Sequence, residues 1–141
     1  MNRIFMLDSG PLGAVAHPRP NLALTQKLIS LIANNDVVVV PEICDYEVRR
    51  SFLLEGLVES VERLNRLKER FAYLPLTTDV MLKAAEFWAE VRKRGQKTAD
   101  DKSLDADVIL AAQASSLNAI VLTDNVKHLE QFVVAKKIQD I

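Results

Sequence analysis

The chain has 141 residues, 49% of them hydrophobic and 26% charged, a composition that predicts one globular domain over residues 1–141 and excludes a disordered chain. Its 18 Lys and Arg against 19 Asp and Glu give a formal net charge of -1, so any binding of nucleic acid has to come from local patches. The single cysteine, Cys44, excludes an internal disulfide and a cysteine-rich zinc site, and the lack of a long apolar run predicts a soluble, cytoplasmic protein without a membrane span.

The spacing of apolar residues predicts strands that alternate with helices. In chain order, the expected elements are a strand at 4–7, a helix at 22–33, a strand at 37–40, two helices between 42 and 72, a strand at 73–76, a helix at 78–94, a polar loop at 96–103, a helix at 104–117, a strand at 119–122, a short helix at 128–132 and a last strand. Ser9-Gly10-Pro11 is expected to interrupt the chain after the first strand, and Gly56 to form the corner between the paired helices. This alternation predicts an α/β fold with a mainly parallel central sheet.

Two of the expected strands are followed closely by an aspartate. Asp8 comes directly after the first strand, and Asp124 follows the strand that ends at Leu122. Binding sites in open parallel sheets form beyond the carboxyl ends of the strands, so these two carboxylates are candidates for one shared site. The alternative is that each Asp only begins a turn or caps a helix, as Asp often does after a strand.

Asp107 is a stronger candidate because it lies among apolar residues of the helix expected at 104–117. It falls on the same face as Leu104 and Ala111, so its side chain is expected to point inward. A buried carboxylate is costly unless it is paired or binds a cation. Asp105 is turned away by about 200° on such a helix, so we expect it in solvent or, at most, as a supporting residue.

Glu47 lies on the helix that follows the second strand, four residues after Ile43, and we expect it to face the same site. The alternative is a tertiary salt bridge to a distant base. Two other acids lie nearby. Glu42 is expected to act as a first-turn charge that favours the helix dipole, and Asp45 to be solvated.

Carboxylates that converge without histidine or thiolate partners favour hard cations such as Mg²⁺ or Mn²⁺ over zinc. Magnesium held by carboxylates keeps water ligands and binds substrate phosphates. It can therefore activate a water molecule for attack on a phosphodiester. The acids thus predict phosphodiester hydrolysis.

These residues, in this order, resemble the PIN-domain family, and in particular its toxins of the VapC type. The resemblance extends over nearly the whole chain, and the stretches that carry it are Leu7-Asp8-Ser9, residues 40–48 with Glu47, Asp107-Val108-Ile109-Leu110-Ala111-Ala112-Gln113-Ala114, and Thr123-Asp124-Asn125. The third stretch is similar to the Asp-x-x-Ile-x-Ala-x-Ala helix of the family. The chain departs from many relatives at His128, where they carry an acid.

The resemblance implies a three-layer α/β/α fold and a Mg²⁺- or Mn²⁺-dependent endoribonuclease that cleaves RNA as the toxin of a type II toxin–antitoxin pair. It also implies a homodimer that a small antitoxin neutralises by inserting near the active site. The metal ligands and catalytic residues would be Asp8, Glu47, Asp107 and Asp124. Ser9 and Asn125 would support them by orienting carboxylates or water.

Basic residues offer contacts for RNA phosphates. Residues 92–97 form the densest positive cluster, and Arg94 and Lys97 are its candidates for RNA binding. Arg49 and Arg50 are similar candidates. The alternative for residues 92–94 is that they only stabilise the end of a helix through its dipole.

Other functions remain to be compared with a nuclease. A non-catalytic PIN-fold protein that binds RNA or regulates a partner is the alternative from a different class. An aspartate-nucleophile phosphatase usually needs Asp-x-Asp, whereas this chain has Asp8-Ser9-Gly10, and a phospho-receiver needs paired acids in its first loop. No glycine-rich phosphate loop follows a strand, which argues against nucleotide cofactors.

Overall fold

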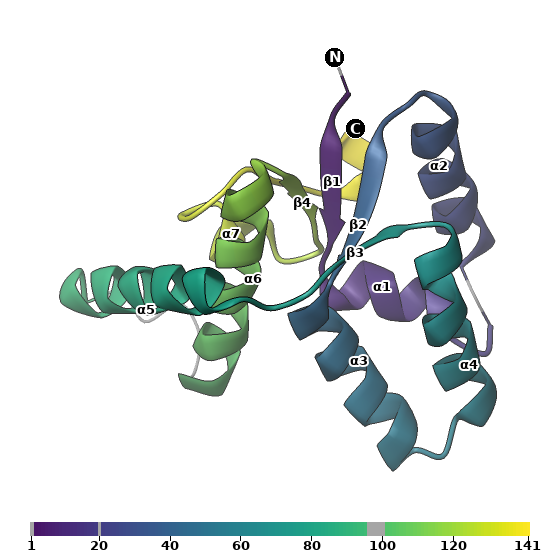
Figure 1. Ribbon diagram of the computed structural model, residues 1–141, viewed down its shortest axis with the longest axis horizontal. Helices are drawn as coiled ribbons and strands as arrows, with labels where there is room; N and C mark the ends of the chain where they lie inside the picture. Colours follow the sequence, from purple (N-terminus) through teal and green to yellow (C-terminus); the bar gives the residue numbers. More distant parts are fainter. Residues whose placement is uncertain (1, 20, 96–100) are drawn as a thin grey trace.

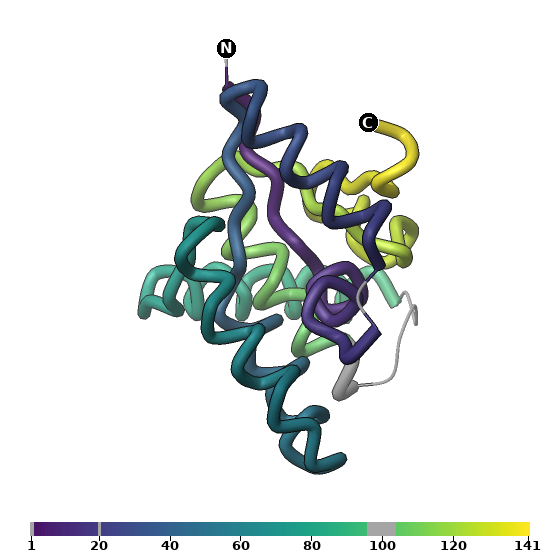
Figure 2. Tube along the Cα trace, turned by 90° about the vertical axis from the view of Figure 1, so that its right-hand side faces the viewer, coloured from purple at the N-terminus to yellow at the C-terminus, as the bar shows by residue number. Residues whose placement is uncertain are grey.

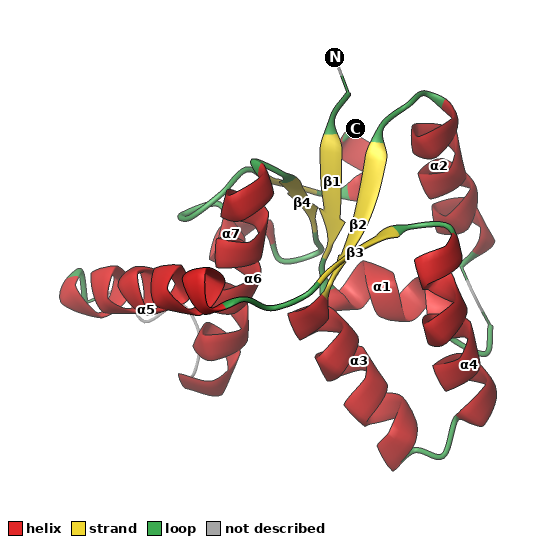
Figure 3. Ribbon diagram, in the orientation of Figure 1, coloured by secondary structure: helices red, strands yellow, loops and turns green. Residues whose placement is uncertain are grey.

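The computed structural model describes residues 2–19, 21–95 and 101–141. Within these ranges, five strands form one all-parallel sheet in the order β3-β2-β1-β4-β5 (Figure 3). The strands are β1 at Ile4–Leu7, β2 at Val37–Pro41, β3 at Ala72–Leu74, β4 at Ile120–Leu122 and β5 at Ala135–Lys136. The parallel sheet expected from the sequence is therefore confirmed. The central strand β1 is its most deeply buried part, with Phe5, Met6 and Leu7 fully enclosed.

Helices cover both faces of the sheet, so the fold is the expected three-layer α/β/α arrangement. The helices are α1 at Ser9–Ala16, α2 at Leu22–Ala33, α3 at Glu42–Leu54, α4 at Val58–Arg66, α5 at Thr78–Lys93, α6 at Asp101–Leu117 and α7 at Val126–Leu129, with short 3-10 helices η1 at Leu67–Glu69 and η2 at Ile138–Asp140. In Figure 1, α2 and α4 lie to the right of the sheet, and α5, α6 and α7 lie to its left.

The start of α1 differs from the sequence prediction. Ser9-Gly10-Pro11 was expected to interrupt the chain, but a helix begins at Ser9. The Asp8 side chain caps this helix by accepting a hydrogen bond from Ser9 N at 2.7 Å. Pro11 lies in the first turn, where its missing N–H leaves no helical hydrogen bond unmade. The expected end of the first strand is therefore confirmed, but the helix that follows it was not predicted.

The helical pair between residues 42 and 72 is confirmed. Helices α3 and α4 form a hairpin that extends away from the sheet (Figure 1, Figure 2). Gly56 forms its corner with a φ of 71°, a backbone conformation that favours glycine. At the other predicted loop, Asp101–Ser103 already belongs to α6, so the helix begins three residues earlier than expected, while residues 96–100 lie outside the described ranges.

Helices α5 and α6 pack against each other around a second hydrophobic cluster. Its buried residues are Val80, Ala84, Phe87 and Val91 from α5 with Leu104, Val108, Ala111 and Ala112 from α6. Trp88 was expected on the same apolar face but is 39% exposed. In the described ranges, no helix has both the length and the apolar character needed to cross a membrane.

Candidate active site

Neighbouring elements bring the candidate acids to the carboxyl edge of the sheet. Strands β1 and β4 are parallel neighbours, and Asp8 N donates to Leu122 O at 3.0 Å, so Asp8 and Asp124 follow adjacent strand ends. On the other side of β1, β2 leads directly into α3, which carries Glu47. Helix α6 contacts α3 and carries Asp107. The arrangement agrees with the general location of sites in open α/β sheets.

Hydrogen bonds hold the Asp8 carboxylate in place. Its Oδ1 accepts from Ser9 N at 2.7 Å, and its Oδ2 accepts from the Thr123 hydroxyl at 2.7 Å. The Cys44 thiol donates more weakly to Oδ1, with Sγ at 3.8 Å. Thr123 is 1% exposed, so its hydroxyl has little access to water and serves this contact. Sequence reasoning did not single out Thr123, because its partner lies far away in the chain.

Asp107 and Glu47 lie in a much less favourable setting. Burial and, next, the charge of Asp8 raise the pKa of Asp107 to about 6, against a smaller lowering by His128. Burial raises the pKa of Glu47 as well, and the charges of Asp8 and Asp107 add to the rise while Arg50 opposes it. The charge of Asp8 therefore acts on both Glu47 and Asp107, which indicates that the three carboxylates lie close to one another.

Asp124 lies against the beginning of α1. A Cβ added to Gly10 would meet Asp124 Oδ2 at 3.1 Å, a contact that most side chains could not make without displacing the carboxylate. The glycine therefore lets the helix backbone approach this acid closely. Asp124 itself is exposed, which places it at the outer side of the candidate site.

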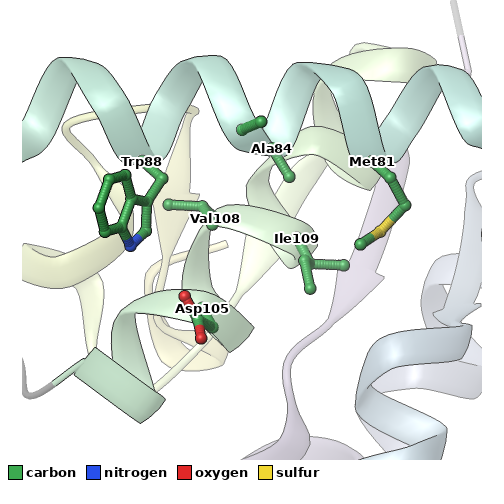
Figure 4. A pocket seen from close by; sticks show the side chains of 7 residues that line it. Met81, Ala84, Trp88, Asp105, Val108 and Ile109 are labelled. Atoms are coloured by element: carbon green, nitrogen blue, oxygen red, sulfur yellow. The ribbon is translucent and has the colours of Figure 1, made fainter.

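Asp105 faces a different surface from Asp107, although both are on α6. It is exposed and lines an open groove between α5 and α6 together with Met81, Trp88 and Val108 (Figure 4). The expectation that Asp105 turns toward solvent agrees with this placement. Its position gives it no contact with the other candidate acids, so a supporting role there is not favoured by the geometry.

The loop after β4 is tied to Asp8 through one hydroxyl. Thr123 Oγ1 accepts from Asn125 N at 2.9 Å while it donates to Asp8. Asn125 thus contributes its backbone to this relay. His128, which follows on α7, places Nδ1 at 3.9 Å from Asp107 Oδ2. A histidine therefore stands beside Asp107 at the edge of the candidate site.

The donor set fits a hydrated hard cation. Asp8, Glu47 and Asp107 offer oxygen only, while burial and the neighbouring carboxylates hold the pKa of the Cys44 thiol well above its usual value and keep it neutral. Among the described side chains, no three from His, Cys, Asp and Glu converge closely enough to form a ready-made metal cage. Such a cage is not what Mg²⁺ usually requires, because it keeps several waters and binds through one or two carboxylates.

The arginines of α3 have different surroundings. Arg49 Nε donates to Asp45 Oδ1 at 2.7 Å, and its Nη1 donates to Asn65 at 2.7 Å. Asp45 is 5% exposed, so the expectation that it is solvated was wrong: the spacing of four residues lets Arg49 neutralise it. Arg50 lies over the ring of Tyr46, 5.1 Å from its centroid. Arg50 is therefore the more accessible of the two RNA-binding candidates.

The other two basic candidates come from the end of α5. Arg94 is exposed and forms the C-cap of this helix, a position at which a cation also favours the helix dipole. Lys97 lies outside the described ranges. Glu42, expected as a first-turn charge of α3, does lie there and accepts hydrogen bonds from Leu76 N at 2.8 Å and from the Tyr73 hydroxyl at 3.3 Å.

A parallel three-layer domain with acids gathered at the carboxyl edge of its sheet defines a class of α/β proteins with a candidate metal site. A family model described as the PIN domain matches residues 5–131. The chain belongs to the PIN-domain family. None of the curated proteins matches it in sequence.

Several solved structures share the fold. A chain of FitAcB from Neisseria gonorrhoeae is 21% identical with a TM-score of 0.73, covering 97% of this chain and 99% of that one. A chain of VapBC2 from Rickettsia felis, solved with a DNA fragment from the promoter, is 18% identical with a TM-score of 0.71, covering 95% and 98%. A chain of VapBC-1 from nontypeable Haemophilus influenzae is 22% identical with a TM-score of 0.68, covering 96% and 98%.

Proposed function

We propose that this PIN-domain protein is a Mg²⁺- or Mn²⁺-dependent endoribonuclease that hydrolyses RNA phosphodiester bonds. The observation that carries the proposal is the gathering of acids from three separate elements, in which the charge of Asp8 raises the pKa of both Glu47 and Asp107. Folding brings these carboxylates together at an energetic cost, because burial and repulsion both disfavour the charged forms of Glu47 and Asp107. Perturbed acids gathered at one edge of a sheet are typical of a functional site.

Within this proposal, some residues would bind the divalent ion and others would orient its ligands. Asp8, Glu47 and Asp107 would hold the divalent ion, with Asp124 as a further ligand from the outer side. The bound ion would supply a Lewis acid that activates water and neutralises charge on the scissile phosphate. Ser9 N and the Thr123 hydroxyl keep the Asp8 carboxylate oriented before any ligand arrives.

Within this proposal, the protein acts in the cytoplasm as the toxin of a type II toxin–antitoxin pair. Support comes from the PIN family together with a shared fold, over nearly the full length, with chains of structures described as VapBC2 and FitAcB. The partners would be an RNA substrate, a small antitoxin protein that inserts near the acids, and a second copy of the chain in a homodimer.

Cleavage of RNA by single-charge variants tests the catalytic proposal. Purified wild-type protein should cut fluorescent oligoribonucleotides with Mg²⁺ or Mn²⁺ and stop when EDTA is added. Asp8→Asn and Asp107→Asn should each lower the cleavage rate by about 100-fold or more, since losing a metal-held charge removes several kcal/mol of transition-state stabilisation. Glu90→Gln is the matched control, because Glu90 is an exposed acid on α5.

The control variant should cleave like the wild type. Circular dichroism and thermal melting should show that both site variants remain folded. If Asp8→Asn and Asp107→Asn cleave RNA at the wild-type rate, the acids are not the catalytic centre and the proposal is wrong.

A second candidate function is that of a non-catalytic PIN-fold protein that binds RNA or regulates a partner. It would need no metal ligands, so the lack of a ready-made cage among the described acids is compatible with it. The two functions differ in whether bound RNA is cleaved. A non-catalytic protein would bind the same oligoribonucleotides but leave them uncut with Mg²⁺ and with Mn²⁺, and its binding would survive Asp107→Asn.

A further inference from the structure

We propose that a pocket beside Tyr46 binds one unpaired nucleotide of the RNA substrate, with the base against the Tyr46 ring and a phosphate near Lys68. We call it the Tyr46 pocket. It has a volume of about 520 Å³, and its polar and aromatic lining consists of Glu42, Asp45, Tyr46 and Arg49 of α3, Lys68 of η1 and Tyr73 of β3. The inference rests on the proposed function, because it gives the acid site a neighbouring subsite for substrate recognition.

Arg50 of α3 links the pocket to the candidate active site. Tyr46 and Glu47 are consecutive on α3 and project in different directions, and Arg50 lies within one helical turn of both. Arg50 connects the two regions electrostatically, since its guanidinium lies 5.1 Å from the Tyr46 ring and its charge acts on Glu47. An RNA strand that presents a phosphate to the acids therefore has this pocket as the next surface along α3.

Tyr46 has the exposure that a stacking residue needs. It is 57% exposed, and Arg50 lies over its ring and restrains it. A single exposed aromatic residue is ordinary on a protein surface and would not by itself indicate a ligand. Here the same ring lines a hollow that also contains a second aromatic residue, Tyr73. Proteins recognise unpaired RNA bases by stacking them on such side chains.

Both carboxylates that line the pocket already have partners, whereas Lys68 has no acidic partner among the described residues. Arg49 is paired with Asp45, and the Glu42 carboxylate accepts hydrogen bonds from Leu76 N and the Tyr73 hydroxyl. Lys68 Nζ lies 4.1 Å from the centroid of the Tyr73 ring and forms no ion pair with any described residue.

Arg50 is likewise outside the ion pairs of the described residues, which leaves two cations available at the margin of the pocket. An aromatic surface with adjacent free cations matches the base and phosphate of a nucleotide.

Direct binding of RNA tests the inference separately from cleavage. The probe is a fluorescent single-stranded oligoribonucleotide of mixed sequence, measured by anisotropy with Asp107→Asn protein, which is expected not to cut it. Adding Tyr46→Ala should weaken binding by about 10-fold, since one base stacked on an aromatic side chain contributes roughly 1–3 kcal/mol. Tyr46→Phe keeps the ring and should bind within about twofold of the parent.

Two further variants complete the design. Lys68→Gln should weaken binding and reduce its dependence on salt, because one phosphate contact is lost. Leu54→Ala is the matched control on α3, since Leu54 is 87% exposed and lies outside the pocket. In a cleaving background, Tyr46→Ala should raise KM while leaving kcat within about twofold, because it removes binding that substrate and transition state share.

The outcomes separate this inference from the catalytic proposal. If Tyr46→Ala binds RNA as tightly as the parent, or if Tyr46→Phe binds as weakly as Tyr46→Ala, the subsite is wrong. Tyr46-dependent binding by a protein that cuts no RNA supports the subsite and rejects the nuclease. If Tyr46→Ala leaves RNA binding intact but abolishes binding of an acidic peptide, the pocket serves a protein partner and the inference is overturned.

Discussion

The carboxylates of Asp8 and Asp107 belong to the same candidate site but differ in the hydrogen bonds that the protein offers them. Asp8 accepts two hydrogen bonds of 2.7 Å, one from the backbone of Ser9 and one from the hydroxyl of Thr123. Within the described part of the chain, the Asp107 carboxylate pairs with His128 Nδ1 at 3.9 Å, and its pKa is raised to about 6. Short hydrogen bonds from the protein hold the Asp8 carboxylate in place, whereas burial disfavours the charged form of Asp107.

This difference suggests how the domain tolerates a cluster of acids without a cation. Asp8 also caps α1, so its orientation is part of folding and should persist whether or not a metal is bound. The charge of Asp107 conflicts with folding, and a divalent ion would relieve that conflict. Substitution of either acid, or of a residue that contacts it, should therefore affect stability and cleavage differently for Asp8 and for Asp107.

The largest expected effect on stability concerns the charge of Asp107. A folded pKa of about 6 lies above the ordinary value of an aspartate, about 3.9, so the folded state holds its proton more tightly than the unfolded state. Stability from this group is therefore full below about pH 4 and is lost as pH rises through about 6. The side chain is 22% exposed, and the loss should be on the order of 2 kcal/mol.

Urea unfolding in EDTA measures this loss. Asp107→Asn cannot ionise, so the free energy of unfolding of the variant should exceed that of the wild type at pH 7.5, and the gap should shrink at pH 4.5. Mg²⁺ should close the gap at pH 7.5 by stabilising only the wild type. Glu90→Gln is the control for a surface charge. A variant less stable than the wild type at both pH values would contradict the comparison.

A smaller effect is expected at Gln113, which joins the helices that carry Glu47 and Asp107. Its side chain is fully buried, accepts from Ile43 N at 3.3 Å at the start of α3, and donates to Leu74 O at 2.9 Å. Replacing it with leucine leaves both backbone groups without this partner. Gln113→Leu should therefore lower the free energy of unfolding by about 1–3 kcal/mol.

Gln113→Leu should also weaken the binding of Mg²⁺ that cleavage depends on, an effect separate from its loss of stability. Without Gln113, α3 and α6 lose a shared polar contact, and the Mg²⁺ concentration for half-maximal cleavage should rise. Ser115→Ala, at an exposed position on α6, is the control and should change neither quantity. Normal metal dependence in folded Gln113→Leu protein would show that this contact does not position the acids.

Much of the fold follows from local patterns in the sequence. The four valines at 37–40 predicted the buried strand β2, and the apolar face of α6 predicted that Asp107 would be partly buried. Helix α1 escaped prediction because Gly10, Pro11 and Gly13 favour a loop locally. Its formation depends on the Asp8 cap and on packing of Leu12 and other apolar residues in the core.

The candidate site was predictable only in part, for a similar reason. An acid after a strand or on an apolar helix face can be recognised from neighbouring residues. The hydroxyl of Thr123 could not, because its partner Asp8 is 115 residues away. The pairing of Asp45 with Arg49 could have been predicted, since residues four apart face each other on a helix.

The smallest expected effect tests the support of Asp8 directly. Thr123→Val preserves the size of the side chain but removes the hydroxyl that donates to Asp8 and accepts from Asn125 N. We expect the free energy of unfolding to fall by about 1–2 kcal/mol and the cleavage rate to fall about tenfold, because a hydrogen bond to a charged group is lost. Thr123→Ser keeps the hydroxyl and should restore most of the cleavage. If the serine and valine variants cleave equally well, packing rather than hydrogen bonding holds Asp8 in place. The difference between Asp8 and Asp107 would then not arise from the hydroxyl of Thr123.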